Sequence, residues 1–215
     1  MPFPFARGDP VSFRPQEDSR GNTDRTAQLN AIVAQFDLNG HPFYYDWRMG
    51  TLPVEKLRDY AAEYGAFVGT IDQGWETIGE THYAEEEREH EELWAGFQLA
   101  LGSGARSQRP QTETLVTAAG NAFGSKPEAI GALYAFEAQQ PNTAQTKLEG
   151  LREHYNVGEA GEKYFVVHAN DFDEVEDLKV HLANLSDAEF ERAKTACAVV
   201  CSAMYGALDG VYYTN

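Results

Sequence analysis

KPEAIGALYAFEAQQP, residues 126–141, is the stretch that says most about how this chain folds. Ile130, Leu133 and Tyr134 recur at the three- and four-residue spacing of one helix face. Glu137 extends that face, although a helix usually buries apolar side chains there. A buried carboxylate costs free energy unless it is paired, protonated or bound to a metal. Glu137 is therefore the first candidate site residue.

Two histidines stand on apolar helix faces in the same way. His90 begins a stripe that runs to Phe97, and His168 lies between Phe165 and Phe172. Taken singly, such a side chain is more often a hydrogen-bonded core group than a ligand. Three metal-competent residues on three separate segments instead favour a site inside a helical bundle, where facing helices supply such groups.

The composition limits the class of protein. With 215 residues, of which 42% are hydrophobic, the chain can bury a good core in one domain. Residues 1–22 are rich in Pro, Arg, Gly and Asp and are expected to form an irregular N-terminal arm. Residues 23–215 are expected to form a single helical domain. The net charge of −17 argues against nucleic-acid binding, because phosphate neutralisation requires basic patches that this chain lacks.

No targeting or membrane-spanning segment is expected. Residues 1–22 contain no continuous apolar stretch of the kind that secretion signals carry. No later segment has the roughly 18 apolar residues that crossing a bilayer requires. The sequence therefore predicts a cytoplasmic protein that makes no use of a membrane.

Helical patterns dominate the chain, and strand patterns are nearly absent. A serine followed three residues later by a glutamate, the spacing of a capping box, opens helices at Ser125 and Ser186. Pro141 is expected to kink or break the helical segment that follows Glu137. One long helix is expected to contain His168. These patterns predict an all-α fold.

Four segments in a fixed order carry a family resemblance. They are HPFYYDWRMGTLPVEKLRDYAAEY (41–64), HEELWAGFQLALG (90–102), ALYAFEAQQP (132–141) and KYFVVH (163–168). Over about residues 25–210 the chain resembles the haem-oxygenase-like superfamily, specifically its CADD-like branch of iron-containing redox enzymes, related to TenA and PqqC. The resemblance implies a compact bundle of about seven to eight helices, a homodimer and a di-iron oxidase site. Some members supply para-aminobenzoate for folate synthesis and draw on a tyrosine of their own.

The resemblance also assigns roles to individual residues. It implies that His90, Glu137 and His168 are metal ligands, in agreement with their places on apolar helix faces. It implies catalytic roles for Tyr44, in the HPFY segment, and for Lys147, ten residues after the carboxylate. Without such roles, Tyr44 would be an aromatic core anchor and Lys147 a surface lysine.

Three ligands that the resemblance implies are missing. Tyr83 stands where a glutamate is expected, seven residues before His90, and Phe172 and Val175 stand where an aspartate and a histidine are expected. For this reason the sequence favours one bound iron over two.

Neighbouring acids could replace the missing ligands. The further candidates for metal binding are Glu86, Glu87 and Asp171. We expect the other acids and the histidine after His168 to lie on a solvated helix face, namely Asp173, Glu174, Glu176, Asp177 and His181.

A ligand set of glutamates and histidines suits one or two non-haem iron ions that activate O2. The sequence thus predicts an oxidase or oxygenase acting on a small molecule or on its own Tyr44. The alternative is a non-catalytic bundle that has lost the di-iron centre and binds a ligand or a partner. Metal-free hydrolysis by a cysteine nucleophile ranks lower, because Cys197 and Cys201 are expected as buried free thiols on a core helix.

Overall fold

The computed structural model describes residues 19–103 and 109–214, with side chains from residue 25. These residues contain no strand, which confirms the predicted all-α fold. The α-helices are α1 Ser19–Val33, α2 Pro42–Arg48, α3 Val54–Val68, α4 Ile71–Ile78, α5 Thr81–Leu101, α6 Pro110–Ala122, α7 Lys126–Glu137, α8 Gln140–Gly150, α9 Gly158–His168, α10 Asp173–Ala183 and α11 Asp187–Tyr213. Short 3-10 turns at Ala34–Phe36 and Leu38–Gly40 join α1 to α2, and a π-helical turn at Leu151–Tyr155 follows α8. Of the expected N-terminal arm, residues 1–18 lie outside the described residues, and α1 already begins at Ser19.

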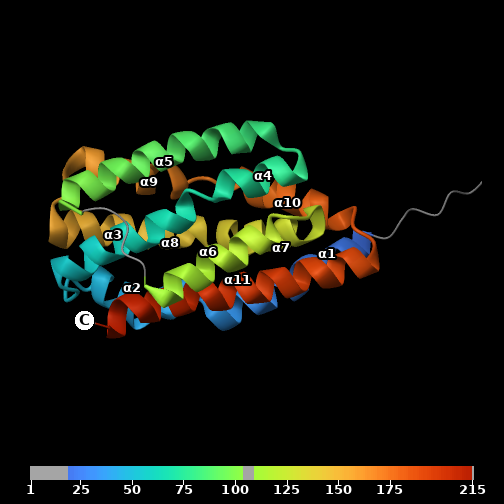
Figure 1. Cartoon of the computed structure of the whole chain (residues 1–215), viewed down its shortest axis with the longest axis horizontal. Coiled ribbons are helices and arrows are strands. Elements are labelled where there is room, and N and C mark those ends of the chain that lie inside the picture. Colours follow the sequence, from blue (N-terminus) through green and yellow to red (C-terminus); the bar gives the residue numbers. More distant parts are fainter. Residues whose placement is uncertain (1–18, 104–108, 215) are drawn as a thin grey trace, which may run out of the picture.

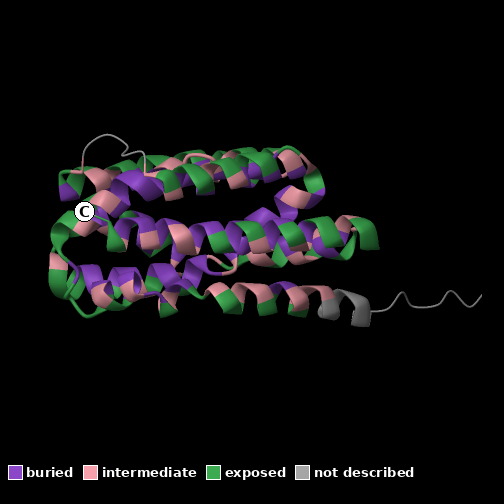
Figure 2. Cartoon of the chain, turned by 60° about the horizontal axis from the view of Figure 1, so that its bottom comes forward, coloured by how far each residue is buried: buried purple, intermediate pink, exposed green. Residues whose placement is uncertain are grey.

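The long helices α5 and α11 organise the bundle (Figure 1). α5 packs against α9, α4 and α3, whereas α11 packs along α7 and α6 and also meets α1. The buried faces of the helices point toward one another (Figure 2). At Gly131 of α7, a Cβ would overlap the carbonyl oxygen of Ala193, so only glycine permits the close approach of α7 to α11.

α11 is the one described helix that is long and apolar enough to cross a membrane by composition, with a mean hydropathy of 1.2. However, 56% of that apolar stretch is buried within the bundle. Cys197 and Cys201 lie there as buried free thiols, as predicted. Its apolar composition is therefore accounted for by its place in the core.

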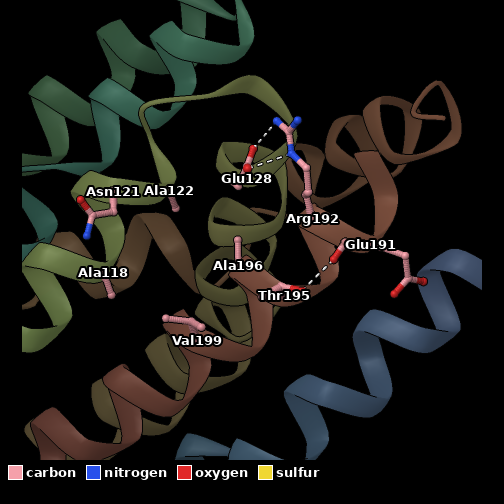
Figure 3. Close-up of a pocket in the computed structure, with 9 residues that line it drawn as sticks. All are labelled: Ala118, Asn121, Ala122, Glu128, Glu191, Arg192, Thr195, Ala196 and Val199. Carbon is pink, nitrogen blue, oxygen red and sulfur yellow. Dashed lines mark hydrogen bonds and ion pairs between the residues drawn. The ribbon is translucent and has the colours of Figure 1, made fainter. Parts of the chain in front are cut away.

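The two predicted capping boxes have different outcomes. At Ser186 the box forms: its side chain accepts from the Glu189 backbone N–H, and the Glu189 carboxylate accepts from the Ser186 N–H. At Ser125 the prediction was wrong, because its hydroxyl donates to the Glu128 carboxylate and caps no backbone N–H. Arg192 of α11 donates to the Ser125 hydroxyl at 2.7 Å. It also donates to Glu128 Oε1 at 2.8 Å (Figure 3). The Glu128 carboxylate is thus engaged by Arg192 and Ser125 and does not complete a capping box.

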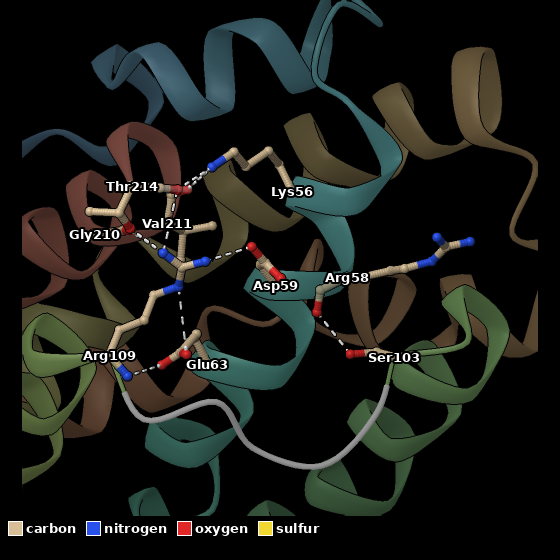
Figure 4. Close-up of polar contacts among 9 residues, drawn as sticks. All are labelled: Lys56, Arg58, Asp59, Glu63, Ser103, Arg109, Gly210, Val211 and Thr214. Atoms are coloured by element: carbon tan, nitrogen blue, oxygen red, sulfur yellow. Dashed lines mark hydrogen bonds and ion pairs between the residues drawn. The ribbon is translucent and has the colours of Figure 1, made fainter.

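Arginine and lysine side chains hold the C-terminal end of α11 against α3 (Figure 4). The Arg109 guanidinium donates to Asp59 at 2.6 Å and to the Gly210 carbonyl at 3.0 Å. Its Nε lies 3.7 Å from Oε1 of the buried Glu63. Lys56 donates to a carbonyl in the last turn of the same helix at 2.9 Å. Cations at a helix C-terminus satisfy its free carbonyls and oppose the negative end of the helix dipole.

The segment around Glu137 breaks as predicted. α7 ends at Glu137, and α8 begins at Gln140 with Pro141 in its first turn. The single long helix predicted around His168 was wrong, because residues 169–172 form a turn between α9 and α10. Asn170 and Asp171 lie in this turn, and both residue types favour turns over helix interiors. The turn changes the direction of α10 and brings its first residues over the core.

Candidate metal centre

Five metal-competent side chains from four helices meet inside the bundle. Glu87 and His90 come from α5, Glu137 from the end of α7, His168 from the end of α9, and Glu174 from the first turn of α10. All five are buried, with exposed fractions between 0% and 7%. Donor atoms of Glu87, His90 and His168 lie within 4.8 Å of one another, as do those of Glu87, Glu137 and Glu174. Glu87 belongs to both groups, so the arrangement offers two adjacent metal positions with one shared carboxylate.

The contacts of His168 leave one of its ring nitrogens free to bind a metal. Nδ1 of His168 lies 2.8 Å from the backbone carbonyl of Tyr164. Because a carbonyl only accepts, Nδ1 carries the hydrogen, and Nε2 is left with a lone pair and no hydrogen-bond partner in the described residues. Burial, with a smaller contribution from His90, lowers the pKa of His168 to about 3, so this imidazole is neutral. Burial alone would lower the pKa of His90, but the Glu87 carboxylate, 3.3 Å from its Nδ1, raises it.

The carboxylates have acceptor atoms without donors. Both oxygens of Glu137, Oε2 of Glu87 and Oε1 of Glu174 are buried and lack a hydrogen-bond partner among the described residues. Burial raises the pKa of Glu137 well above its usual range, and the charges of Glu174 and Glu87 raise it further. Burial and Glu87 raise the pKa of Glu174 to about 9. Buried acceptors that are left unpaired this close together are what a divalent cation satisfies, so these residues fit bound iron.

Of the three further candidate ligands, the structure places only one in the candidate metal centre. Glu87, but neither Glu86 nor Asp171, belongs to the two groups of donor atoms. The partly exposed Glu86 lies 3.7 Å from Nε2 of His82. Asp171 contributes negative charge that raises the pKa of Glu137 without belonging to either group.

Glu174 is the site residue that the sequence reasoning missed, and the prediction that it lies on a solvated face was wrong. It is 3% exposed, because the turn after His168 directs the first turn of α10 inward. A signal was present, since Glu174, Leu178 and Leu182 follow one another at four-residue spacing. This is the same pattern, a carboxylate extending an apolar stripe, that singled out Glu137.

The three residues at the missing ligand positions do not bind metal. Tyr83 donates its hydroxyl to Asp177 at 2.9 Å. Phe172 is 56% exposed, and Val175 is an alkyl side chain. Glu87 and Glu174 supply carboxylates one turn from Tyr83 and close to Val175, respectively. Candidate carboxylates therefore lie close to positions at which the resemblance led us to expect ligands.

Tyr44 and Lys147 lie together in a second buried cluster. The Tyr44 hydroxyl is 2.9 Å from that of Tyr60. Lys147 is 2% exposed, so the alternative of a surface lysine was wrong. Its Nζ lies 5.0 Å from the centre of the Tyr44 ring and 5.9 Å from that of Tyr64. Burial lowers the pKa of Lys147 to about 7, which leaves much of the amine neutral and nucleophilic at neutral pH.

The tyrosine cluster adjoins the candidate metal centre. Burial raises the pKa of Tyr64, and the nearby Tyr44 and Glu137 raise it further. The Tyr164 ring stacks on His168 at 4.1 Å, and its hydroxyl accepts from Gln140 at 2.7 Å. Aromatic side chains therefore connect the position of the metal with that of Tyr44.

Comparison with solved structures identifies the fold. A protein from Shewanella denitrificans OS217 with a heme oxygenase-like fold superposes with a TM-score of 0.71 at 16% identity, covering 89% of this chain and 91% of that one. A CADD-like protein from Nostoc punctiforme gives 0.64 at 18% identity, covering 89% and 96%. At these identities the likeness shows a common fold, which is the predicted haem-oxygenase-like bundle.

Comparison with known sequences identifies the family to which the chain belongs. The 4-aminobenzoate synthase of Nitrosomonas europaea is 27% identical over 221 residues, covering 86% of this chain and 89% of that protein. Residues 72–197 match the profile of a family described as iron-containing redox enzymes. This match spans more than half of the chain and includes all five residues of the candidate centre. The protein accordingly belongs to the iron-containing redox enzyme family.

Proposed function

We propose that this protein is a non-haem iron oxidase that activates O2 at the buried centre formed by Glu87, His90, Glu137, His168 and Glu174. The observation that carries the proposal is the sharing of Glu87 between two groups of donor atoms whose acceptors are otherwise unpaired. The sequence alone favoured one iron. Glu87 and Glu174 now supply enough ligands to support two.

Bound iron would supply the reductive activation of O2, while the protein orients the ligands and excludes water. His90 and His168 offer imidazoles on one side of Glu87, and Glu137 and Glu174 offer carboxylates on the other. The burial of all five side chains keeps bulk water from the reacting centre. Tyr164 fixes His168 through its backbone carbonyl and its stacked ring.

The substrate that we propose is a small molecule or the side chain of Tyr44 itself. Tyr44 is fully buried, and its hydroxyl is held by Tyr60 close to the Lys147 amine. The relatives named 4-aminobenzoate synthase support a product that contains both an aromatic ring and an amine. Tyr44 and Lys147 would supply or position these two groups, which gives both residues catalytic roles.

The alternative, a bundle that binds a ligand or partner without catalysis, makes a different prediction for the buried acid. It requires Glu137 to pair with Lys147 or with a tyrosine hydroxyl. Instead, both Glu137 oxygens lack a hydrogen-bond partner in the described part of the chain. The unpaired acid supports the oxidase over the alternative.

A cytoplasmic location and a homodimer complete the proposal. Cytoplasmic reductants would maintain iron in the ferrous state and the two cysteines as free thiols. Light scattering of the purified protein tests the dimer.

The proposed function is tested by loading the purified protein with Fe(II) under anaerobic conditions and measuring bound iron, followed by O2 uptake. We expect close to two iron ions per chain and rapid O2 consumption in the wild type, both lost in the double variant Glu137→Ala, His168→Ala. Glu86→Ala, which removes a neighbouring acid outside the centre, is the matched control and should retain both. Absence of iron from the wild-type protein would contradict the proposal and favour the non-catalytic bundle.

A further inference from the structure

Glu174 reaches the candidate centre from the less firmly packed end of α10. The C-terminal half of α10 is anchored by Leu178 and Leu182, which are fully buried. Arg25 of α1 adds to this anchor by donating to the carbonyls of Leu182 at 3.0 Å and Leu185 at 2.6 Å. The first turn, by contrast, follows the 56% exposed Phe172. A separate contact must therefore fix the turn that carries Glu174.

Two polar contacts join α10 to α5, and we call their four residues, Glu80, Tyr83, Asp177 and His181, the latch. The Tyr83 hydroxyl donates to Asp177 Oδ2 at 2.9 Å, and Nε2 of His181 lies 2.8 Å from Glu80 Oε1. The hydrogen bond from Tyr83 lies nearest the metal centre. Tyr83 is four residues before Glu87 on α5, and Asp177 is three residues after Glu174 on α10. At these spacings Tyr83 and Asp177 each lie on the same helix face as a candidate ligand.

The latch opposes a repulsion that the ligands themselves create. Glu87, Glu137 and Glu174 approach one another with Asp171 nearby, and like charges in a buried site repel strongly. Metal binding requires these groups as carboxylates, and in that charged state their repulsion opposes the approach of the first turn of α10 to α5. The Tyr83 hydroxyl draws the two helices together without adding charge to the centre.

We propose that Tyr83 and Asp177 are positioning residues, which fix the first turn of α10 so that Glu174 completes the all-carboxylate metal position. The inference rests on the proposed function, since it concerns the second of the two metal positions. Tyr83 thus occupies the place of a missing ligand and acts through a helix rather than through a bond to the metal.

The test is an anaerobic Fe(II) titration of the metal-free protein that resolves the affinity of each equivalent. Tyr83→Phe removes only the hydroxyl and keeps the ring packed on Trp75, 4.6 Å away. We expect one equivalent to keep its wild-type affinity and the other to bind about 10-fold more weakly, the lower end of the loss seen when a hydrogen-bonded partner of a metal ligand is removed, because Tyr83 acts through a helix. Asp177→Ala should have the same effect, and the double variant should be no weaker than either single variant, because both remove one interaction.

Two controls separate positioning from general damage. Asp177→Asn keeps an oxygen that accepts from Tyr83 and should bind both equivalents nearly as the wild type does. Tyr155→Phe removes a hydroxyl that donates to the Leu52 carbonyl at 3.0 Å, remote from the five ligands, and should leave both affinities unchanged.

Each other outcome contradicts a specific step. Wild-type affinity for both equivalents in Tyr83→Phe overturns the positioning role and leaves the proposed function intact. Loss of both equivalents in that variant also overturns it, because the effect would not be confined to one position. A wild-type protein that binds a single equivalent removes the second metal position, and one that binds none refutes the proposed function itself.

Discussion

Two buried glutamates of this bundle, Glu63 and Glu137, are equally inaccessible and have opposite surroundings. Each is 1% exposed. Glu63 accepts from the Arg109 backbone N–H at 3.3 Å and lies 3.7 Å from Nε of the same side chain. Glu137 has no hydrogen-bond partner in the described residues, and its nearest charged neighbours include Glu174 and Glu87. Burial alone therefore does not distinguish a structural acid from a functional one, whereas the sign of the neighbouring charges does.

The difference has an energetic meaning. A buried ion pair such as that of Glu63 and Arg109 returns part of the desolvation cost of both charges. The raised pKa values of Glu137 and Glu174 indicate that no such partner offsets the burial of their charged forms, which a bound cation would do. The contacts of Arg109 with Glu63 and the end of α11 should thus stabilise the fold by themselves, and the metal centre should stabilise it only in the metal-bound protein.

The largest expected effect is the loss of iron from Glu137→Gln. The amide cannot replace a carboxylate charge at a centre whose ligands must neutralise a divalent ion, so iron affinity should fall by two orders of magnitude or more. Stability of the metal-free variant, measured by urea unfolding, should equal or exceed that of the metal-free wild type, because a repelling acid has been removed. A clear loss of stability without metal would show that Glu137 is a structural acid like Glu63.

The next largest effect is the loss of stability on replacing Arg109. Arg109→Met leaves Glu63 buried without its cation, a change that costs about 3–5 kcal/mol when a buried pair is broken. Partial exposure of Arg109 and Asp59 places the expected cost at the lower end of that range. Iron binding at 25 °C should be unchanged in the folded variant. Coupled loss of stability and iron affinity would contradict the separation of the two regions.

The sequence predicted the region of Glu137 better than it predicted that of Glu174, for a physical reason. Glu137 ends a helix in which every residue from Ala129 onward is buried, so its burial could be predicted from an uninterrupted apolar run. The direction of Glu174 depends on the turn at residues 169–172, and a sequence pattern that continues through a turn does not reveal the change in axis. The fold itself was predictable, because long stripes and the Ser186 capping box agree with one another.

The surroundings of Lys147 and Arg109 were also not predictable from the sequence. The burial of Lys147 could not be inferred from QPNTAQTKLEG, in which polar residues surround it and no apolar stripe includes it. Only the tertiary arrangement of Tyr44, Tyr60, Tyr64 and Phe165 around its amine shows that this cation is enclosed by rings. In the sequence Arg109 lies in a loop. Its contact with the Gly210 carbonyl depends on the C-terminal end of α11, about a hundred residues away in the sequence.

A smaller effect is expected from Lys147, whose titration makes the free energy of unfolding depend on pH. Burial lowers its pKa from 10.5 to about 7 in the folded protein, so between these values the unfolded chain binds more protons than the folded one. Stability therefore rises with pH from about 7 to about 10.5, by at most about 1.4 kcal/mol per pH unit from this group. Lys147→Met should lack this contribution, and urea unfolding at pH 7.5 and 9.5 compares the two slopes. Equal slopes would show that Lys147 is paired with an acid in solution, as Arg109 is.

The smallest expected effect comes from an ion pair near the surface. Arg192 contacts Glu128 as Arg109 contacts Asp59, but the Arg192 and Glu128 side chains are 51% and 29% exposed. Water screens such a pair, so Arg192→Met should cost only about 0.2–1 kcal/mol in urea unfolding, against several times more for Arg109→Met. Both variants remove one guanidinium that contacts a carboxylate, and the difference between them reports the burial of Arg109 together with its contacts to Glu63 and to the end of α11. Equal costs would mean that the cation beside Glu63 contributes no more than a solvated one, and the contrast with Glu137 would then rest on metal binding alone.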